Sequence, residues 1–235
     1  MNCNPQALME AARSEGRRKL LEHESLCLCE CYGIPVPKYG LARSSAEAVE
    51  IAKKIGFPVV MKIVSPDIMH KSDVGGVALG VRTFEEVQEK YTSIIRSAML
   101  RAPGARVHGV LVQEMLPKGL EVIVGATRDP YFGPVVMAGI GGVFVEVLKD
   151  VSFRVAPLTP VDAGEMLKSL KGYRLFEGFR GEGPRDKAAV VDVILRVSEL
   201  ITELDEVAEV DLNPVMVFEE GHGAKVADAR FVLRW

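Results

Sequence analysis

The sequence lacks the long apolar segments that membrane insertion and secretion require. No run of 18 apolar residues occurs among the 235 residues, so a transmembrane helix is not expected. The first 20 residues, "MNCNPQALMEAARSEGRRKL", contain no apolar stretch after their charges, which argues against a signal peptide. The net charge of −3 argues against a broad basic surface for nucleic acid. We therefore predict a cytoplasmic globular protein.

Cysteine is scarce, and its spacing argues against a metal centre. Three of the four cysteines, Cys27, Cys29 and Cys31, form "CLCEC" in a segment with a helical pattern, and the fourth is Cys3. On a helix Cys27 and Cys31 share a face while Cys29 points away, and zinc sites usually use CxxC spacing. We expect reduced thiols that pack as small apolar side chains.

Several common nucleotide-binding and catalytic motifs are also missing. No GxxxxGK[ST] sequence occurs, and "GIGGVF" fails the GxGxxG pattern at its last position. No HExxH and no GxSxG occur either. These absences argue against a P-loop, a Rossmann dinucleotide site and the corresponding zinc and serine enzymes.

Helical and strand patterns are mixed along the whole chain. Apolar spacing and capping residues predict helices over residues 5–32, 44–56, 83–102, 159–170 and 184–207. Short apolar runs predict strands over residues 57–64, 75–81, 107–116, 120–129, 131–158, 207–218 and 223–233. The strands at 107–116 and 120–129, joined by "PKG", suggest a hairpin. We predict an α+β fold with two lobes, residues 1–112 and 113–235.

One histidine lies in an unusual setting. His70 is part of "PDIMHKSDVGGV", which is too polar for a core strand and ends in a Gly75–Gly76 pair that we expect to be flexible. A loop histidine is often only a satisfied polar residue, but imidazole is also a good nucleophile near neutral pH. Both interpretations are open from the residues alone.

Charged residues at the ends of apolar strands are further candidates. Lys62 follows "PVVM" and is either a surface lysine with a packed stem or a phosphate contact. Glu114 and Glu121 are either exposed strand charges or ligands of ribose hydroxyls. Asp211 and Asn213 alternate onto one face of a strand, and Asp228 follows in the next strand. The last three are either an ordinary hairpin or oxygen ligands for magnesium, which needs only one or two side chains beside phosphates and water.

Taken together, these segments resemble an ATP-grasp domain. In detail they are similar to the β subunits of ADP-forming acetyl-CoA synthetases, in the NDP-forming acyl-CoA synthetase superfamily that includes succinyl-CoA synthetase. The similarity rests on the order of "YGIPVPKYGLA", "FPVVMKIVSPDIMHKSDVGGVALGV", "VLVQEMLPKGLEVIVGATRDPYFGPVVMAGIGGVFVEVLKDVSFRVAPL" and "EVDLNPVMV". Their combined length covers nearly the whole chain.

The resemblance implies a nucleotide between the two lobes and a role for each candidate residue. Lys62 corresponds to a lysine that contacts nucleotide phosphates, and His70 to a phosphate-accepting histidine that succinyl-CoA synthetases lack at this place. The remaining correspondences are an adenine-bordering segment at Glu114, Met115 and Leu116, a carboxylate near ribose at Glu121, magnesium ligands at Asn213 and Asp228 with Asp211 beside them, and a phosphate contact at Arg154.

The implied enzyme converts acyl-CoA, ADP and phosphate into free acid, CoA and ATP. A CoA-binding α subunit would form acyl phosphate and pass the phosphoryl group through its own histidine to His70, in an α2β2 assembly with Mg²⁺ and ADP or ATP. Two other functions stay open: an ATP-grasp ligase that makes a free acylphosphate, and a regulatory subunit that only binds nucleotide. A piece of a fused chain is a third possibility, which the start at Met1 disfavours.

Overall fold

The chain divides into two compact units. The structure is a computed structural model that describes residues 4–142, 149–178, 181 and 183–235. Unit 1 comprises Met1–Leu20, Glu24–Val36 and Pro117–Trp235, and unit 2 comprises Leu21–His23 and Pro37–Leu116. These units differ from the division after residue 112 expected from the sequence, because residues 113–116 belong to unit 2 and most of the N-terminal segment belongs to unit 1. The N-terminal segment groups with the C-terminal residues because Lys19 forms a β-bridge with Val232 and the Leu20 amide donates to the Phe231 carbonyl over 3.2 Å.

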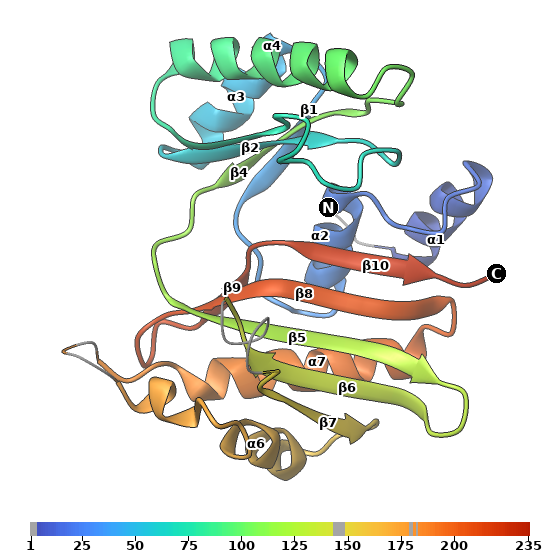
Figure 1. Ribbon diagram of the computed structural model, residues 1–235, viewed down its shortest axis with the longest axis vertical. Coiled ribbons are helices and arrows are strands. Elements are labelled where there is room, and N and C mark those ends of the chain that lie inside the picture. Colours follow the sequence, from blue (N-terminus) through green and yellow to red (C-terminus); the bar gives the residue numbers. More distant parts are fainter. Residues whose placement is uncertain (1–3, 143–148, 179–180, 182) are drawn as a thin grey trace. The chain divides into compact units, whose positions relative to one another are not determined.

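Unit 2 is a four-stranded sheet covered by two helices on one face. Its strand order is β1-β4-β2-β3, and every neighbouring pair is antiparallel. Figure 1 shows α3 and α4 on the same side of this sheet. Because β4 lies between β1 and β2, residues 36–64 form a split strand–helix–strand unit. The elements are β1 (Tyr39–Ala42), α3 (Ser45–Ile55), β2 (Val59–Val64), β3 (Val77–Val81), α4 (Phe84–Arg101) and β4 (Gly109–Glu114).

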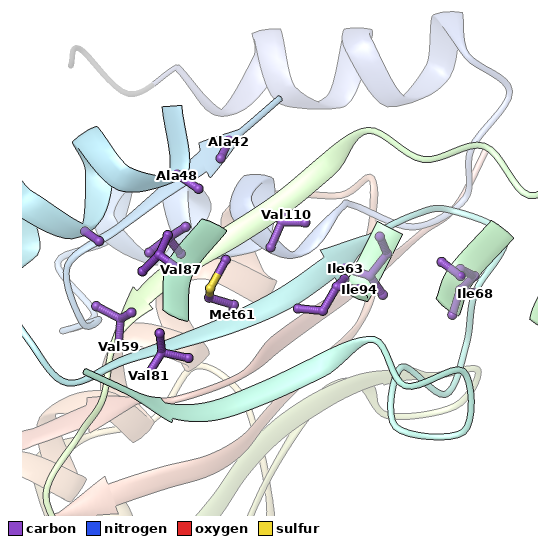
Figure 2. Packing of buried hydrophobic residues seen from close by; sticks show 13 residues of the cluster. Ala42, Ala48, Val59, Met61, Ile63, Ile68, Val81, Val87, Ile94 and Val110 are labelled. Atoms are coloured by element: carbon purple, nitrogen blue, oxygen red, sulfur yellow. The ribbon is translucent and has the colours of Figure 1, made fainter. Parts of the chain in front are cut away.

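The alternation of β2 sorts its side chains between the two faces of the sheet. Val59, Met61 and Ile63 are fully buried in the cluster that packs beneath the helices. Figure 2 shows Met61 and Ile63 in one cluster with Val87 and Ile94 of α4. Since side chains alternate along a strand, the same pattern directs Lys62 to the face opposite the helices.

Unit 1 contains a six-stranded sheet with helices against one face. The strand order is β10-β8-β5-β6-β7, with β9 paired to β8, and Figure 1 shows these strands in that succession. Helix α7 packs on β5, β6 and β8. The helix predicted over residues 184–207 is confirmed, and its apolar residues Val190, Ile194, Val197, Leu200 and Ile201 are buried. The elements are α1 (Pro5–Ser14), α2 (Glu22–Cys31), β5 (Leu120–Asp129), β6 (Gly133–Ile140), β7 (Val151–Val155), α6 (Pro160–Lys168), η1 (Tyr173–Glu177), α7 (Lys187–Glu203), β8 (Val207–Val217), β9 (Ala224–Val226) and β10 (Ala229–Leu233).

The N-terminal helix predicted over residues 5–32 is wrong as a single element. It is broken between α1 and α2, where Gly16 adopts a left-handed φ of 67°. Beyond this break the buried Arg17 donates to both carboxylate oxygens of Glu24, over 2.8 and 2.9 Å. No helix in the described part of the chain is long and apolar enough to cross a membrane.

The expectation of reduced thiols holds for two cysteines and is wrong for a third. Cys27 and Cys29 form no disulfide, and Cys29 is fully buried. Cys31 is disulfide-bonded. It is the last residue of α2 and only half-buried, so its sulfur is accessible to another thiol in a way that the Cys29 sulfur is not. Cys3 lies outside the described residues, as does part of the strand predicted over 131–158.

The predicted hairpin between residues 107–116 and 120–129 is also wrong. Strand β4 pairs with β1 and β2 in unit 2, whereas β5 pairs with β6 and β8 in unit 1. The "PKG" connection is therefore a passage from one sheet to another. Gly119 fits there because a Cβ atom would lie 2.5 Å from the Val217 carbonyl oxygen.

Candidate functional site

His70 lies at the exposed tip of the loop between β2 and β3. The loop is anchored at its start by Ile68, which is buried in the core of unit 2. At its end the Gly76 carbonyl accepts from the Ile63 amide over 2.7 Å. Between these anchors the Arg101 guanidinium of α4 donates to the Asp73 carbonyl over 3.0 Å. The loop is thus fixed at both ends, and His70 is exposed between them.

The two glycines of this loop are required by its geometry and packing, and the flexibility expected of them from the sequence stays a prediction. Gly75 has a left-handed φ of 64°, which glycine adopts without strain. A Cβ atom on Gly76 would lie 2.4 Å from Cγ2 of Ile63 and 2.8 Å from the Lys71 carbonyl oxygen. The Gly76 amide also donates to that carbonyl over 2.7 Å, so the chain closes tightly beneath the tip.

Lys62 pairs with a carboxylate that the sequence patterns did not single out. Its Nζ atom donates to Oε1 of Glu22 over 2.5 Å. The other oxygen of the same carboxylate accepts from Nζ of Lys71, the residue after His70. The Glu22 side chain is 3% exposed and that of Lys62 is 12% exposed. Lys62 is therefore a largely buried cation with a built counter-ion, which argues against a simple surface lysine.

The two lysines determine the charge state of Glu22. Burial alone would raise the pKa of its carboxyl group, but the ammonium groups of Lys62 and Lys71 outweigh burial and hold that pKa below its ordinary value. The site is consequently a carboxylate between two cations, with one net positive charge. Glu22 is 40 residues from Lys62 in the sequence, and no local pattern relates them.

The segment predicted to border adenine forms the end of β4 and the residues that follow. The Glu114 carboxylate accepts from the Lys38 amide over 3.0 Å, so it stabilises the chain entering β1. The Met115 amide donates to the Pro58 carbonyl over 3.1 Å, and its side chain is 39% exposed. Leu116 is half-buried. Glu114 thus has a structural partner within unit 2.

Of the candidate magnesium ligands, Asp211 and Asn213 lie on β8 of unit 1, and Asp228 lies in the short link between β9 and β10 rather than in the strand predicted over 223–233. The backbone N–H of Asn213 donates to the backbone carbonyl of Asp228 over 3.1 Å, which places the two residues opposite each other. Between Val122 and Val124 the pairing of β5 with β8 shifts by one residue, at Asn213 in β8. Such a bulge redirects a side chain, and Asn213 is exposed beside the buried Leu212.

The side chain of Asp211 pairs with an arginine on the neighbouring strand. Its carboxylate lies 3.5 Å from the Arg230 guanidinium, which also contacts Glu209 over 2.8 Å. Burial, together with the charge of Glu209, raises the pKa of Asp211 despite the opposing effect of Arg230. Asp211 therefore already has a cationic partner, Arg230.

The residues present fit a weakly held magnesium ion better than a closed metal cage. Across the described residues no group of three or more histidine, cysteine, aspartate or glutamate side chains could hold a metal. One amide oxygen and one carboxylate, from Asn213 and Asp228, are enough for Mg²⁺ when phosphates and water complete its shell. Such an ion would depend on its nucleotide for tight binding.

Glu121 lies on the face of the unit 1 sheet opposite the helices, and Arg154 lies on the face that the helices cover. Glu121 is exposed next to the buried Val122. The backbone of Gly141 closes against it, with the Gly141 amide donating to the Glu121 carbonyl over 2.7 Å. Arg154 pairs in register with the buried Val136, so by alternation it lies on the opposite face, toward the helices. Within unit 1, Arg154 therefore lies on the other face of the sheet from Glu121.

The two α+β units are those of a protein of the ATP-grasp class, as comparison with known proteins shows. Residues 11–233 match the family model described as an ATP-grasp domain. The β subunit of acetate–CoA ligase [ADP-forming] I from Pyrococcus furiosus is 49% identical over 226 residues, 96% of each chain. Acetate–CoA ligase [ADP-forming] I from Archaeoglobus fulgidus is 51% identical over 219 residues, which are 32% of its length.

A solved relative has nearly the same structure. The acetyl-coenzyme A synthetase 1 of Ca. Korarchaeum cryptofilum, in complex with coenzyme A and Ca-AMPCP, has a chain that superposes with a TM-score of 0.94. The two are 50% identical over 98% of this chain and 100% of that one. The chain belongs to the ATP-grasp family, and the α+β fold predicted from the sequence is confirmed. Within that family it belongs to the β subunits of the ADP-forming acetate–CoA ligases.

Proposed function

We propose that His70 carries a phosphoryl group between a partner subunit and ADP. The observation that carries the proposal is the position of His70, which is exposed at the tip of a loop that is anchored at both ends. The residue after it, Lys71, shares the Glu22 carboxylate with Lys62. A solved form of the Korarchaeum protein has a phosphohistidine segment pointing towards its nucleotide-binding site, and phosphohistidine chemistry next to a nucleotide is what the proposal assigns to His70.

The transfer requires only groups that the loop and a nucleotide supply. In the ATP-consuming direction a ring nitrogen of neutral His70 attacks the γ-phosphorus, the bond from that phosphorus to the bridging oxygen breaks, and ADP leaves with the electron pair. The second ring nitrogen keeps its proton, so the phosphorylated ring is a cation and a good leaving group. The same step in reverse passes the phosphoryl group to ADP and makes ATP.

The remaining candidates would bind the nucleotide. Lys62 would neutralise phosphate charge, and Glu121 would accept from ribose hydroxyls. Asn213 and Asp228 would hold Mg²⁺, which when bound neutralises the phosphates during transfer. We assign these roles to one Mg-nucleotide and leave out Arg154, because its face of the sheet is opposite to that of Glu121.

A partner subunit is part of the proposal. The relatives named as β subunits imply a second subunit, and we propose that it binds CoA, forms the acyl phosphate and assembles with this chain as α2β2. The acyl group would be recognised there, so this chain should not determine whether acetate or a larger acid is the product. The cytoplasmic location predicted from the sequence stays a prediction.

The test is phosphorylation of the purified chain by γ-labelled ATP with Mg²⁺. We expect acid-labile, base-stable label in the wild type and none in His70→Asn. His222→Asn is the matched control, since His222 is also exposed in a turn, and it should label like the wild type. Label that persists in His70→Asn would contradict the carrier role. No label in the wild type despite tight Mg-ADP binding would instead favour a ligase with a free acylphosphate or a regulatory subunit.

A further inference from the structure

One carboxylate in unit 2 binds two lysines that belong to different parts of the proposed mechanism. Oε1 of Glu22 accepts from Lys62 in β2, and Oε2 accepts from Lys71 in the His70 loop. We infer that Glu22 is a positioning residue that latches the His70 loop to Lys62, and that phosphate oxygens displace it. The inference rests on the proposed function, to which it adds a residue that controls when the carrier loop is released.

The contacts of the loop explain why this latch controls its tip. Ile68 and Gly76 fix the two ends through the core and through a backbone hydrogen bond to Ile63. Met69 and His70 are exposed, with 69% of Met69 accessible. Lys71, 24% exposed in its side chain, connects this exposed part to Glu22. Breaking the Lys71–Glu22 pair therefore removes the side-chain contact that ties the exposed part of the loop to Glu22, while the backbone hydrogen bond from Gly76 to the Lys71 carbonyl and the contact of Arg101 with Asp73 remain.

Because Glu22 bridges two lysines, a phosphate can replace it at one of them without leaving a buried charge unpaired. An uncompensated carboxylate at 3% exposure would be strongly destabilising. Because Glu22 has two cationic partners, one lysine can turn to a phosphate while the other still neutralises the carboxylate. Phosphate oxygens form strong charge-assisted hydrogen bonds with ammonium groups and carry more charge than one carboxylate. A nucleotide phosphate on Lys62, or a phosphoryl group on His70 beside Lys71, would thus compete directly with Glu22.

The latch predicts effects of opposite sign on loop order and on nucleotide affinity. Glu22→Gln keeps the shape of the side chain but removes its charge. We expect amide hydrogen exchange of residues 69–75 to become roughly tenfold faster, the scale of one charge-assisted hydrogen bond. We expect Mg-ADP to bind several-fold more tightly, roughly up to tenfold, because Lys62 no longer shares its charge with an anion. A merely structural residue would loosen the loop and weaken binding together.

Two further variants complete the experiment on the full chain. Lys71→Gln breaks only the half of the latch that holds the loop, so exchange should rise as in Glu22→Gln without tighter Mg-ADP binding. Asp67→Asn is the control, since Asp67 lies in the same loop but pairs with Arg106 over 2.9 Å and touches neither lysine of the latch. It should leave both the exchange of residues 69–75 and the Mg-ADP affinity at wild-type values.

The outcomes separate this inference from the proposed function. If the wild type is labelled at His70 but Glu22→Gln has wild-type exchange and affinity, the latch is wrong and the carrier role stands. If the wild type is not labelled, exchange and calorimetry still test the latch. Weaker Mg-ADP binding in Glu22→Gln would also overturn it. If circular dichroism shows that Glu22→Gln does not fold, Lys71→Gln provides the test, since the Lys71 side chain is 24% exposed. Wild-type amide exchange of residues 69–75 in Lys71→Gln would then refute the latch.

Discussion

Replacing Gly76 by alanine should destabilise unit 2 because the new methyl group has no space. The added carbon would lie 2.4 Å from Cγ2 of Ile63 and 2.8 Å from the Lys71 carbonyl oxygen. Ordinary contacts between carbon atoms are about 3.5–4.0 Å, so the first overlap exceeds roughly 1 Å. The second contact is with backbone, which cannot rotate away. Overpacking of this kind costs about 1–3 kcal/mol, and the tight closure under the His70 loop should open.

Urea unfolding of Gly76→Ala measures this cost as a lower midpoint at an unchanged denaturant slope. The matched control is Gly164→Ala in α6, where an added Cβ meets nothing within 4 Å. In a helix interior the same change should stabilise the protein by about 0.5–1 kcal/mol. Opposite signs for one chemical change would isolate the steric effect. A Gly76→Ala protein with wild-type stability would show that the loop does not close as described.

Three further predictions concern the charged residues. Asn213→Ala should weaken Mg-ADP binding about tenfold or more but leave ADP binding in EDTA unchanged, as calorimetry can show; equal losses would mean that Asn213 binds no metal. Lys62→Met should lower the unfolding free energy in urea by about 1–3 kcal/mol, with Lys71 still neutralising Glu22; an unchanged midpoint would make the pair unimportant. The pKa of Glu22 is held below its ordinary 4.5, so the pair contributes fully above pH 4.5 and is lost as pH falls through the lower folded-state value. Between pH 6 and pH 3 the unfolding free energy should therefore fall more steeply in the wild type than in Glu22→Gln. The same pH dependence in both proteins would contradict the lowered pKa of Glu22.

Elements whose character depends on local periodicity were predictable from the sequence. The apolar run "VVMKIV" predicts a short buried strand that bears one charge, Lys62, and β2 has that form. The 3.6-residue spacing of apolar residues was likewise sufficient to predict α7. The helices predicted to start at Ser44, Thr83 and Thr159 begin there, since each of these side chains accepts from a backbone amide of the first turn.

Features that depend on distant partners were not predictable in this way. The "PKG" connection has the length of a hairpin loop, but β4 and β5 find partners in different sheets, and nothing local favours one choice. The same limit applies to Glu22. Its neighbours "EHES" continue a helical pattern, and only the folded chain brings it to Lys62 and to the His70 loop. Candidate residues chosen from motifs therefore included Lys62 but not the carboxylate that balances it.

The pairing of Lys62 with Glu22 does not conflict with a role in phosphate binding. Burying the ammonium group of a lysine whose side chain is 12% exposed is costly unless an anion lies beside it. Glu22 supplies that anion and holds the ammonium group over 2.5 Å, away from the apolar core. The affinity of Lys62 for a phosphate is then the difference between two charge-assisted contacts, which makes binding weaker but exchange easier. For a residue that must release ADP or ATP after each transfer, a replaceable carboxylate is better suited than a lysine left to hold the phosphate alone.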